Sequence, residues 1–314
     1  MAGSDPVPSI GVDLGGTKIE AIVLDAQGST RWRGRVPTPA GDYDATLAAI
    51  GALLQRAQSA TGFAPDAPLG IGTPGSPTRA GRIKNANSTC LNGQALRDDL
   101  AELLHRPVRL ANDADCLALS EASDGAGAGA RVVFAVILGT GVGGGIVVDG
   151  RLLDGPNRTA GEWGHNPLPW ADADDGHAPS CYCGQRGCVE AWLSGPALAL
   201  DHFRRTGVAL DPPHIAQGAA AGDVDCETSL QRYESRLARA LAGVVNLLDP
   251  DVIVLGGGLS NLERLTTRVP ALWSRHIFGA TSSATSAEPV TTRLVRSRHG
   301  DSSGVRGAAR LWQD

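Results

Sequence analysis

The segment CYCGQRGCVE, at positions 181–190, gathers three of the six cysteines of this chain. Its C-x-C-x4-C spacing offers three thiolates, so a tetrahedral zinc site would need one further ligand. His165 and His177 both lie near enough in the sequence to supply it, and spacing alone does not separate them. A thioredoxin-like redox site would need C-x-x-C beside a βαβ unit, which is missing. The cluster is therefore predicted to hold a structural zinc ion.

Three glycine-rich runs are suited to phosphate binding: DLGGTK at 13–18, LGTGVGGG at 138–145 and VLGGGLSN at 254–261. Backbone N–H groups without neighbouring Cβ atoms form nests for phosphate oxygens. No run has Walker A spacing, and tight turns or close strand–helix packing would explain each run taken alone. Because the first two runs recur in a duplicated unit, we expect contacts to phosphate groups from Asp13, Gly15, Gly16, Thr17, Lys18, Gly139, Thr140, Gly141, Gly143, Gly144, Gly256, Gly257 and Gly258.

Carboxylates follow a predicted strand in RLANDAD, where the strand ends at Asn112 and Asp113. A carboxylate at the end of a strand that faces a cleft can accept a hydroxyl proton. A helix N-cap is the structural alternative, and Asp115 could fill that role instead. Asp13 competes as the base, but its place at a phosphate-binding hairpin suits work near Mg²⁺ better. Asp113 is therefore predicted to be the general base.

Three further polar residues lie near the cysteines: Glu162 and His165 in GEWGHNP, and Glu190 directly after the cluster. Glutamate is usually a solvated surface residue. Flanking glycines and the neighbouring metal motif favour a functional role for all three.

These residues are carried by a repeated pattern. The segments IGVDLGGTKIEAIVLDAQG and FAVILGTGVGGGIVVDGRL each contain an apolar run, a Gly/Thr turn, a second apolar run and a polar turn. Each is predicted to be a hairpin. The repetition indicates two similar α/β halves facing each other across a cleft, where ligands commonly bind. Helices are expected at 45–60 and 228–248, and the glycine-rich 124–130 segment is the candidate hinge.

Composition narrows the class of protein. A chain of 314 residues predicts about two domains, and the net charge of −5, with scattered basic residues, favours a small-molecule partner over nucleic acid or a membrane surface. The first ten residues lack a signal-peptide pattern, and the longest apolar run, VVFAVIL, is too short to cross a bilayer. A cytoplasmic location is expected, where crowded cysteines favour a metal over disulfides.

In sequence order, DLGGTK, GTPG, AND, LGTGVGGG, GEWGH, C-x-C-G-x-x-G-C-x-E and VLGGG resemble the ROK family of sugar kinases and repressors. NANSTCLNG and TAGEWGHNPLPW look especially like bacterial fructokinases with mannose activity. The resemblance implies a duplicated actin-like (ribonuclease H-like) α/β fold, with ATP and Mg²⁺ between two domains. The smaller domain would comprise 1–123 and the C-terminal helix at about 301–314, and the larger one 124–300. A homodimer is expected on the same ground.

The resemblance also implies roles for individual residues. Asp113 would be the base, and sugar hydroxyls would be bound by Asn87, Asn112, Glu162, His165 and Glu190. It selects His165 over His177 as the zinc ligand beside Cys181, Cys183 and Cys188. Two departures fall near the expected sugar site: Cys90 stands where similar fructokinases tend to have tryptophan, and Thr73 replaces an aliphatic residue in G-x-P-G.

The expected activity is ATP-dependent phosphorylation of the 6-hydroxyl of fructose, and of mannose as well. N-acetylglucosamine or glucose is the alternative substrate within the family. A sugar-responsive repressor is disfavoured, because DLGGTK begins at residue 13 and leaves no room upstream for a winged helix. An actin-type or chaperone-type ATPase would explain the phosphate hairpins but not the carboxylates near a zinc-ordered loop.

Overall fold

The structure, a computed structural model, describes residues 8–280 and 288–313 and contains two five-stranded sheets. The hydrogen-bonded order is β3-β2-β1-β4-β7 in one sheet and β10-β9-β8-β11-β12 in the other, beside a small β5-β6 ribbon. The strands are β1 Ser9–Leu14, β2 Lys18–Leu24, β3 Thr30–Pro37, β4 Leu69–Thr73, β5 Ser76–Pro77, β6 Ile83–Lys84, β7 Val108–Asn112, β8 Val132–Leu138, β9 Val142–Val148, β10 Arg151–Leu152, β11 Val252–Gly256 and β12 Arg293–Arg296.

Both sheets are built in the same way. β1 pairs with β2 and β2 with β3 in antiparallel fashion, while β4 and β7 extend the sheet in parallel. In the second sheet β9 lies between β8 and β10, and β11 and β12 extend it in parallel. The predicted duplication of a glycine-turn hairpin is confirmed, and the mixed sheets agree with the predicted actin-like fold.

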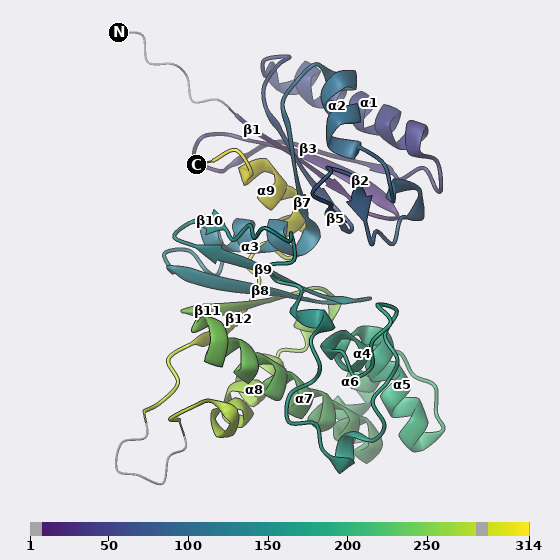
Figure 1. Cartoon of the computed structure of the whole chain (residues 1–314), viewed down its shortest axis with the longest axis vertical. Coiled ribbons are helices and arrows are strands. Elements are labelled where there is room, and N and C mark those ends of the chain that lie inside the picture. Colours follow the sequence, from purple (N-terminus) through teal and green to yellow (C-terminus); the bar gives the residue numbers. More distant parts are fainter. Residues whose placement is uncertain (1–7, 281–287, 314) are drawn as a thin grey trace. The chain divides into compact units, whose positions relative to one another are not determined.

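Helices cover both faces of the first sheet (Figure 1). The α-helices are α1 Tyr43–Thr61, α2 Leu96–Leu104, α3 Asp113–Asp124, α4 Val189–Leu193, α5 Gly195–Thr206, α6 Pro212–Ala220, α7 Val224–Leu248, α8 Leu265–Trp273 and α9 Ser303–Arg310. Side chains alternate across β1, so Ile10, Val12 and Leu14 join the core beneath α1 and α2. On the opposite face, Ile22 and Leu24 of β2 pack with Val305 and Ala309 of α9.

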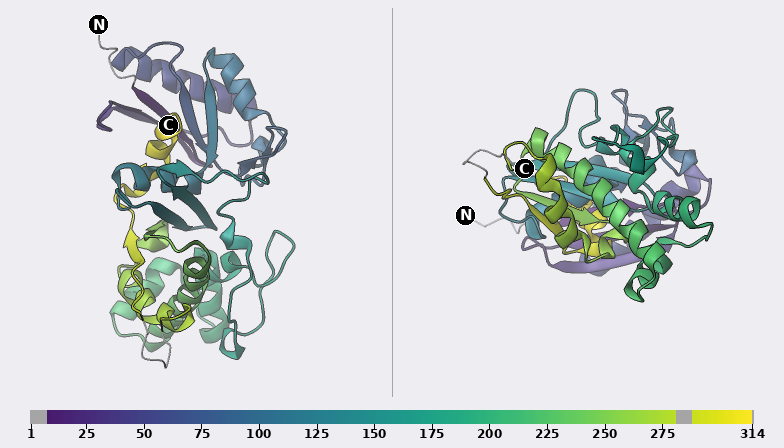
Figure 2. Two further views of the ribbon diagram at one scale, coloured as in Figure 1. Left: turned by 60° about the vertical axis from the view of Figure 1, so that its left-hand side comes forward. Right: turned by 90° about the horizontal axis from the view of Figure 1, so that it is seen from below.

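Close packing against α9 depends on glycine. A Cβ atom at Gly11 of β1 would lie 2.4 Å from the backbone nitrogen of Ala309. The C-terminal segment can therefore pack against the first strands of the chain, as the yellow and purple ribbons show in Figure 2. The sequence predicted a helix here from the resemblance alone, and α9 occupies Ser303–Arg310.

The long helix α7 follows the predicted apolar period. Leu230, Tyr233, Leu237 and Leu241 are buried along one face, and the helix ends at Asp249, whose φ of 47° is left-handed. The predicted helix over 45–60 is also present, as α1. The residues after β11 form a 3-10 turn, Gly258–Asn261.

The chain divides into two compact units. The first comprises the residues up to Ala128, Gly145–Ala160 and the residues from Arg298 onward, and the second comprises Gly129–Gly144 and Gly161–Ser297. The domain boundaries at 123/124 and 300/301 stay a prediction. Within the described residues, no helix combines the length and the apolar character that crossing a bilayer requires.

Candidate active site

The first glycine run forms the tight connection between β1 and β2. The Gly15 amide donates to the Lys18 carbonyl at 3.0 Å, which closes the turn. Thr38, directly after β3, braces it from the side: its hydroxyl donates to the Gly15 carbonyl at 2.7 Å, and its amide donates to the Thr17 carbonyl. With these carbonyls engaged on one side, the turn has the fixed backbone that a phosphate nest requires. The sequence analysis did not anticipate the role of Thr38.

Two carboxylates influence each other beside this turn. Burial, together with the nearby charges of Asp113 and Glu20, raises the pKa of Asp13 to about 6, while Lys18 and Arg35 oppose the shift. Asp13 ends β1, and Asp113 follows β7 two strands away in the same sheet. The predicted base, Asp113, and the carboxylate predicted to work near Mg²⁺, Asp13, are thus brought together within the first unit. Repelling carboxylates of this kind form a donor set that suits a hard divalent cation.

The raised pKa of Asp13 predicts a stability cost at neutral pH. The folded state holds this proton up to about pH 6, whereas the unfolded chain releases it near 3.8. Stability contributed by this group therefore falls as the pH rises from about 4 to 6. In buffer without Mg²⁺, Asp13→Asn is expected to raise the free energy of unfolding by about 1–3 kcal/mol at pH 8, with a smaller gain at pH 4.

Urea unfolding at the two pH values measures this effect, with Asp115→Asn as the matched control on the same unit. A variant that is no more stable than the parent at pH 8 would contradict the predicted repulsion.

The start of α3 defines the positions of Asn112 and Asp113. Asn112 is the N-cap, and its side-chain oxygen accepts from the Asp115 amide at 2.6 Å. The N-cap role, which was the structural alternative for this pair of residues, therefore belongs to Asn112. Asp113 is exposed in the first helical turn, and one of its oxygens accepts from the Ala114 amide at 2.8 Å. Asp113 therefore lies at the N-terminus of α3, directly after β7.

Asn87 lies in a segment held beside the glycine turn. The side-chain amide of Asn92 binds the backbone of Ala86 in both directions, at 2.9 and 3.0 Å, so the residue before Asn87 is fixed. A Cβ atom on Gly16 would lie 3.5 Å from the Ser88 hydroxyl, which places this segment next to the turn. Asn87 itself is exposed. The first unit thus gathers the predicted phosphate turn, the base and one predicted sugar-binding segment.

Gly304 of the C-terminal helix lies next to Asp13, a contact that the sequence did not predict. A Cβ atom on Gly304, in the first turn of α9, would lie 2.9 Å from an Asp13 carboxylate oxygen. Only a glycine permits this approach, because the neighbouring carboxylate is already crowded. The sequence HGDSSG marks the position, but nothing local in it indicates a contact with residue 13.

In the second unit, two of the glycine runs lie side by side. Gly256, at the end of β11, pairs with Ile137 of β8, so the residues after each strand emerge at the same edge. Gly257 and Gly258 follow Gly256 there, and the 139–141 turn follows β8. The structure thus brings together these predicted nucleotide-binding residues in the second unit.

The GEWGH turn is docked on β9. The Trp163 indole nitrogen donates to the Gly143 carbonyl at 3.0 Å, and the ring meets Phe134 edge-on with centroids 5.7 Å apart. Trp163–His165 forms a 3-10 turn that follows Glu162. Glu162 is therefore carried by a segment anchored to the predicted phosphate hairpin.

Glu190 also contacts this hairpin. One of its carboxylate oxygens accepts from the Val142 amide at 2.9 Å. A Cβ atom on Gly141 would lie 2.6 Å from that same oxygen, so the glycine leaves room for the carboxylate. Glu190 thus connects α4 to the LGTGVGGG turn, a link that spacing in the sequence does not reveal.

The three cysteines and one histidine converge on a single point. The ligand atoms of His165, Cys181, Cys183 and Cys188 all lie within 4.8 Å of one another. The His165 Nδ1 atom is 3.6 Å from the Cys181 sulfur, and the Cys183 and Cys188 sulfurs are 3.6 Å apart. A tetrahedron with Zn–S bonds of about 2.3 Å has edges near these lengths. His177 is exposed and does not belong to the cluster.

The thiols of this cluster differ in acidity. Hydrogen bonding from the Gln185 amide lowers the pKa of Cys183 to about 7, whereas burial raises that of Cys188 to about 12. Three thiolates would not coexist here at neutral pH without a cation to offset their charge. The donor set therefore fits a zinc ion that displaces thiol protons as it binds.

His165 is engaged at both ring nitrogens. Its Nδ1 atom faces the sulfur cluster, and its Nε2 atom lies 3.1 Å from the Tyr182 hydroxyl. The imidazole and phenol rings also meet edge-on, 5.3 Å apart. A contact from His165 to a sugar, as predicted, would have to share Nε2 with Tyr182.

The cysteine loop is joined to the GEWGH turn by backbone hydrogen bonds. The Leu168 amide donates to the Gly187 carbonyl at 2.9 Å, and the Val189 amide donates to the Asn166 carbonyl at 2.8 Å. Glu190 directly follows Val189, the last residue joined to the GEWGH turn by these hydrogen bonds. Glu162, His165 and Glu190 therefore belong to one interconnected loop system within the second unit.

A buried ion network anchors the polar segment at 171–177. The Asp175 carboxylate receives hydrogen bonds from Arg236 at 2.9 Å and from Arg239 at 2.7 Å, and these partners lower its pKa. The Arg236 guanidinium also stacks on Trp192 of α4, 4.6 Å from the ring centroid. Asp175 was overlooked in the sequence because its segment has the composition of a solvated loop.

Comparison with known proteins covers almost the whole chain. The profile of the ROK family matches residues 9–314. The N-acetyl-D-glucosamine kinase of Escherichia coli O139:H28 (strain E24377A / ETEC) is 40% identical over 309 residues, which is 96% of this chain and 98% of that protein.

Two solved structures agree in fold. The ROK hexokinase from Thermus thermophilus superposes with a TM-score of 0.84 at 32% identity, covering 96% of this chain and 97% of that one. A ROK family glucokinase from Streptomyces griseus, in complex with glucose and AMPPNP, gives a TM-score of 0.75 at 28% identity, covering 97% and 98%.

Proposed function

The chain belongs to the ROK family of sugar kinases, and from this premise we propose that it transfers the γ-phosphoryl group of ATP to the 6-hydroxyl of N-acetyl-D-glucosamine. The observation that supports this choice of substrate is the 40% identity to an N-acetyl-D-glucosamine kinase over 96% of the chain. The placement of Asp13, Asn87 and Asp113 around one glycine turn supports the reaction type.

The choice of sugar revises the sequence-based expectation. Short motifs favoured fructose, with N-acetylglucosamine or glucose as the alternative, and similarity over the full length favours that alternative. Hexose selectivity depends on a few hydrogen bonds, so motifs shared by the whole family carry little information about it. Glucose is the second candidate, because the Streptomyces griseus relative was solved with that sugar.

In the proposed reaction, Asp113 accepts the proton of the 6-hydroxyl as that oxygen attacks the γ-phosphorus. The new O–P bond forms while the bond from phosphorus to the ADP oxygen breaks, and the proton resides on the Asp113 carboxylate. The helix N-terminus at Asp113 and its exposed position support this role. Catalysis of phosphoryl transfer consists mainly of positioning and electrostatic stabilisation.

Each unit has its own proposed phosphate-binding groups. The turn at Gly15, Gly16 and Thr17 and the carboxylate of Asp13 belong to the first unit, and the glycine runs after β8 and β11 begin in the second. Mg²⁺, when bound, would neutralise charge on the phosphates. Asp13 is the residue proposed to hold the cation. Its carboxylate is buried and lies near the charge of Asp113, so a bound cation would offset the repulsion between the two groups.

A structural zinc ion is part of the proposal. It would be held by His165, Cys181, Cys183 and Cys188, and would lock the loop that carries Glu162 and Glu190. Sugar hydroxyls are the proposed partners of these glutamates and of Asn87 and Asn112. Through the hydrogen bond to the Val142 amide, Glu190 would also couple this loop to the second glycine run.

A coupled assay of ADP formation over N-acetylglucosamine, glucose, mannose and fructose tests the proposal. The expected result is the highest kcat/KM for N-acetylglucosamine, because a pocket shaped for the acetamido group gains hydrogen bonds that the other sugars lack. A preference for fructose would restore the motif-based prediction. ATP hydrolysis indifferent to all four sugars would reject the kinase function.

A further inference from the structure

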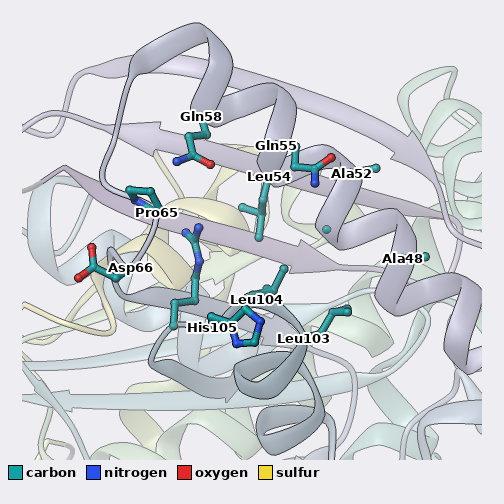
Figure 3. A pocket seen from close by; sticks show the side chains of 12 residues that line it. Ala48, Ala52, Leu54, Gln55, Gln58, Pro65, Asp66, Leu103, Leu104 and His105 are labelled. Atoms are coloured by element: carbon teal, nitrogen blue, oxygen red, sulfur yellow. The ribbon is translucent and has the colours of Figure 1, made fainter.

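A cavity lies in the first unit, and none of the residues assigned to the reaction lines it. Its volume is about 510 Å³, within the range of small-molecule sites, and it is formed by α1, the end of α2 and the segment before β4. None of Asp13, Asn87 and Asp113 lines it. Figure 3 shows Gln58 and Asp66 toward one end of the cavity and Ala48 and Leu103 toward the other.

The polar end contains an under-satisfied guanidinium. Arg106 lines the cavity, yet only 9% of its surface is exposed. Its Nε atom is buried without a hydrogen-bond partner among the described residues, and Nη1 has only a long contact of 3.4 Å to the Ala67 carbonyl. The guanidinium also lies over the Phe63 ring, 5.4 Å from its centroid. The guanidinium thus has one buried N–H group without an acceptor and one long contact among the described residues, which leaves it capacity to bind a further acceptor.

The groups around Arg106 limit which class of ligand could bind it. Burial lowers the pKa of Arg106, and the charge of Asp66 offsets only part of this shift. A planar, acceptor-rich group is the natural complement of a guanidinium. Asp66 and the carbonyl ends of α1 and α2 lie on the same side, and they oppose a doubly charged phosphate. A single carboxylate is planar and rich in acceptors, and it carries only one negative charge.

The opposite end is apolar. Ala48 and Ala52 present methyl groups and Gly51 presents bare backbone from α1, and Leu103, which is 50% exposed, lines the same space from the end of α2. An exposed leucine beside a row of small residues offers surface to a short hydrocarbon chain.

We propose that this cavity is a binding site for a small monocarboxylate with an apolar body, with the carboxylate on Arg106 and the apolar part along Ala52 and Leu103. The site would be independent of the kinase reaction, since it shares no residue with the groups assigned to it. A ligand held between α1 and α2 would act on the core that these helices form with β1.

Calorimetric titration of the full chain with hexanoate, hexanamide and inorganic phosphate tests the proposal. Hexanoate is expected to bind at least about tenfold more tightly than hexanamide, the difference made by one charged hydrogen bond, and phosphate is expected not to bind. Ala52→Leu, an exposed helical position, should fill the cavity and weaken hexanoate at least about tenfold. Ala60→Leu makes the same change on the same helix outside the cavity and should bind like the parent.

Four results would overturn the site. Equal affinity for hexanoate and hexanamide would remove Arg106 from recognition, and absence of hexanoate binding would remove the ligand class. Unchanged binding in Ala52→Leu would place the ligand elsewhere. A dimer that dissociates only in Ala52→Leu, measured by sedimentation, would also count against it, because a second copy would then cover the cavity.

Discussion

Replacing Asp113 by asparagine is expected to lower kcat by about 10²- to 10⁴-fold, the contribution of a positioned general base. Asparagine keeps the side-chain oxygen that accepts from the Ala114 amide, so the first turn of α3 should persist. It cannot accept the hydroxyl proton at neutral pH. The KM for the sugar should change little, because hydrogen bonding to the 6-hydroxyl remains possible.

Steady-state kinetics and sugar binding by calorimetry measure the two effects separately. Asp115→Asn is the matched control, because it makes the same change two residues later in the same helix and should retain most of kcat. Near-normal turnover in Asp113→Asn would transfer the role of base to Asp13, the nearby carboxylate with the raised pKa. Equal losses in both variants would instead indicate damage to α3.

Removing the proposed zinc is expected to damage sugar binding. Structural zinc sites contribute about 10 kcal/mol or more to local folding, so Cys188→Ser or chelation should release the loop that carries Glu162 and Glu190. The KM for the sugar should rise by up to about 10²-fold, since misplacement by about 1 Å can cost that much. The KM for ATP should change less, because the first glycine turn is braced by Thr38 in the other unit.

Metal analysis supplies a readout that does not depend on activity. The parent protein should carry zinc and Cys188→Ser should not, while Cys90→Ser, which leaves the cluster intact, should keep it. Limited proteolysis should cleave the 161–190 region of the metal-free protein faster. A zinc-free protein with parental KM for the sugar would refute the assignment.

The sequence by itself determined the features that depend on local pattern. Apolar runs around glycine turns specify the β1–β2 hairpin and its counterpart at β8–β9, and a period of 3.6 residues specifies α7. The thiolate spacing predicted a metal site because ligand geometry leaves few alternatives. Family motifs gave the class of reaction, but they did not identify the sugar, for which similarity over the whole length was needed.

Only the tertiary structure decided how distant segments meet. It put the Glu190 carboxylate on the Val142 amide and buried Asp175 between two arginines of α7. It also placed His165 with the cysteines, a choice over His177 that the family resemblance implied and residue spacing alone left open. It also placed the charge of Asp113 close enough to Asp13 to raise a pKa. These contacts join residues far apart in the chain through backbone pairing and close packing at glycines. No local pattern encodes them, because a side chain's partner depends on which segments the fold places beside it.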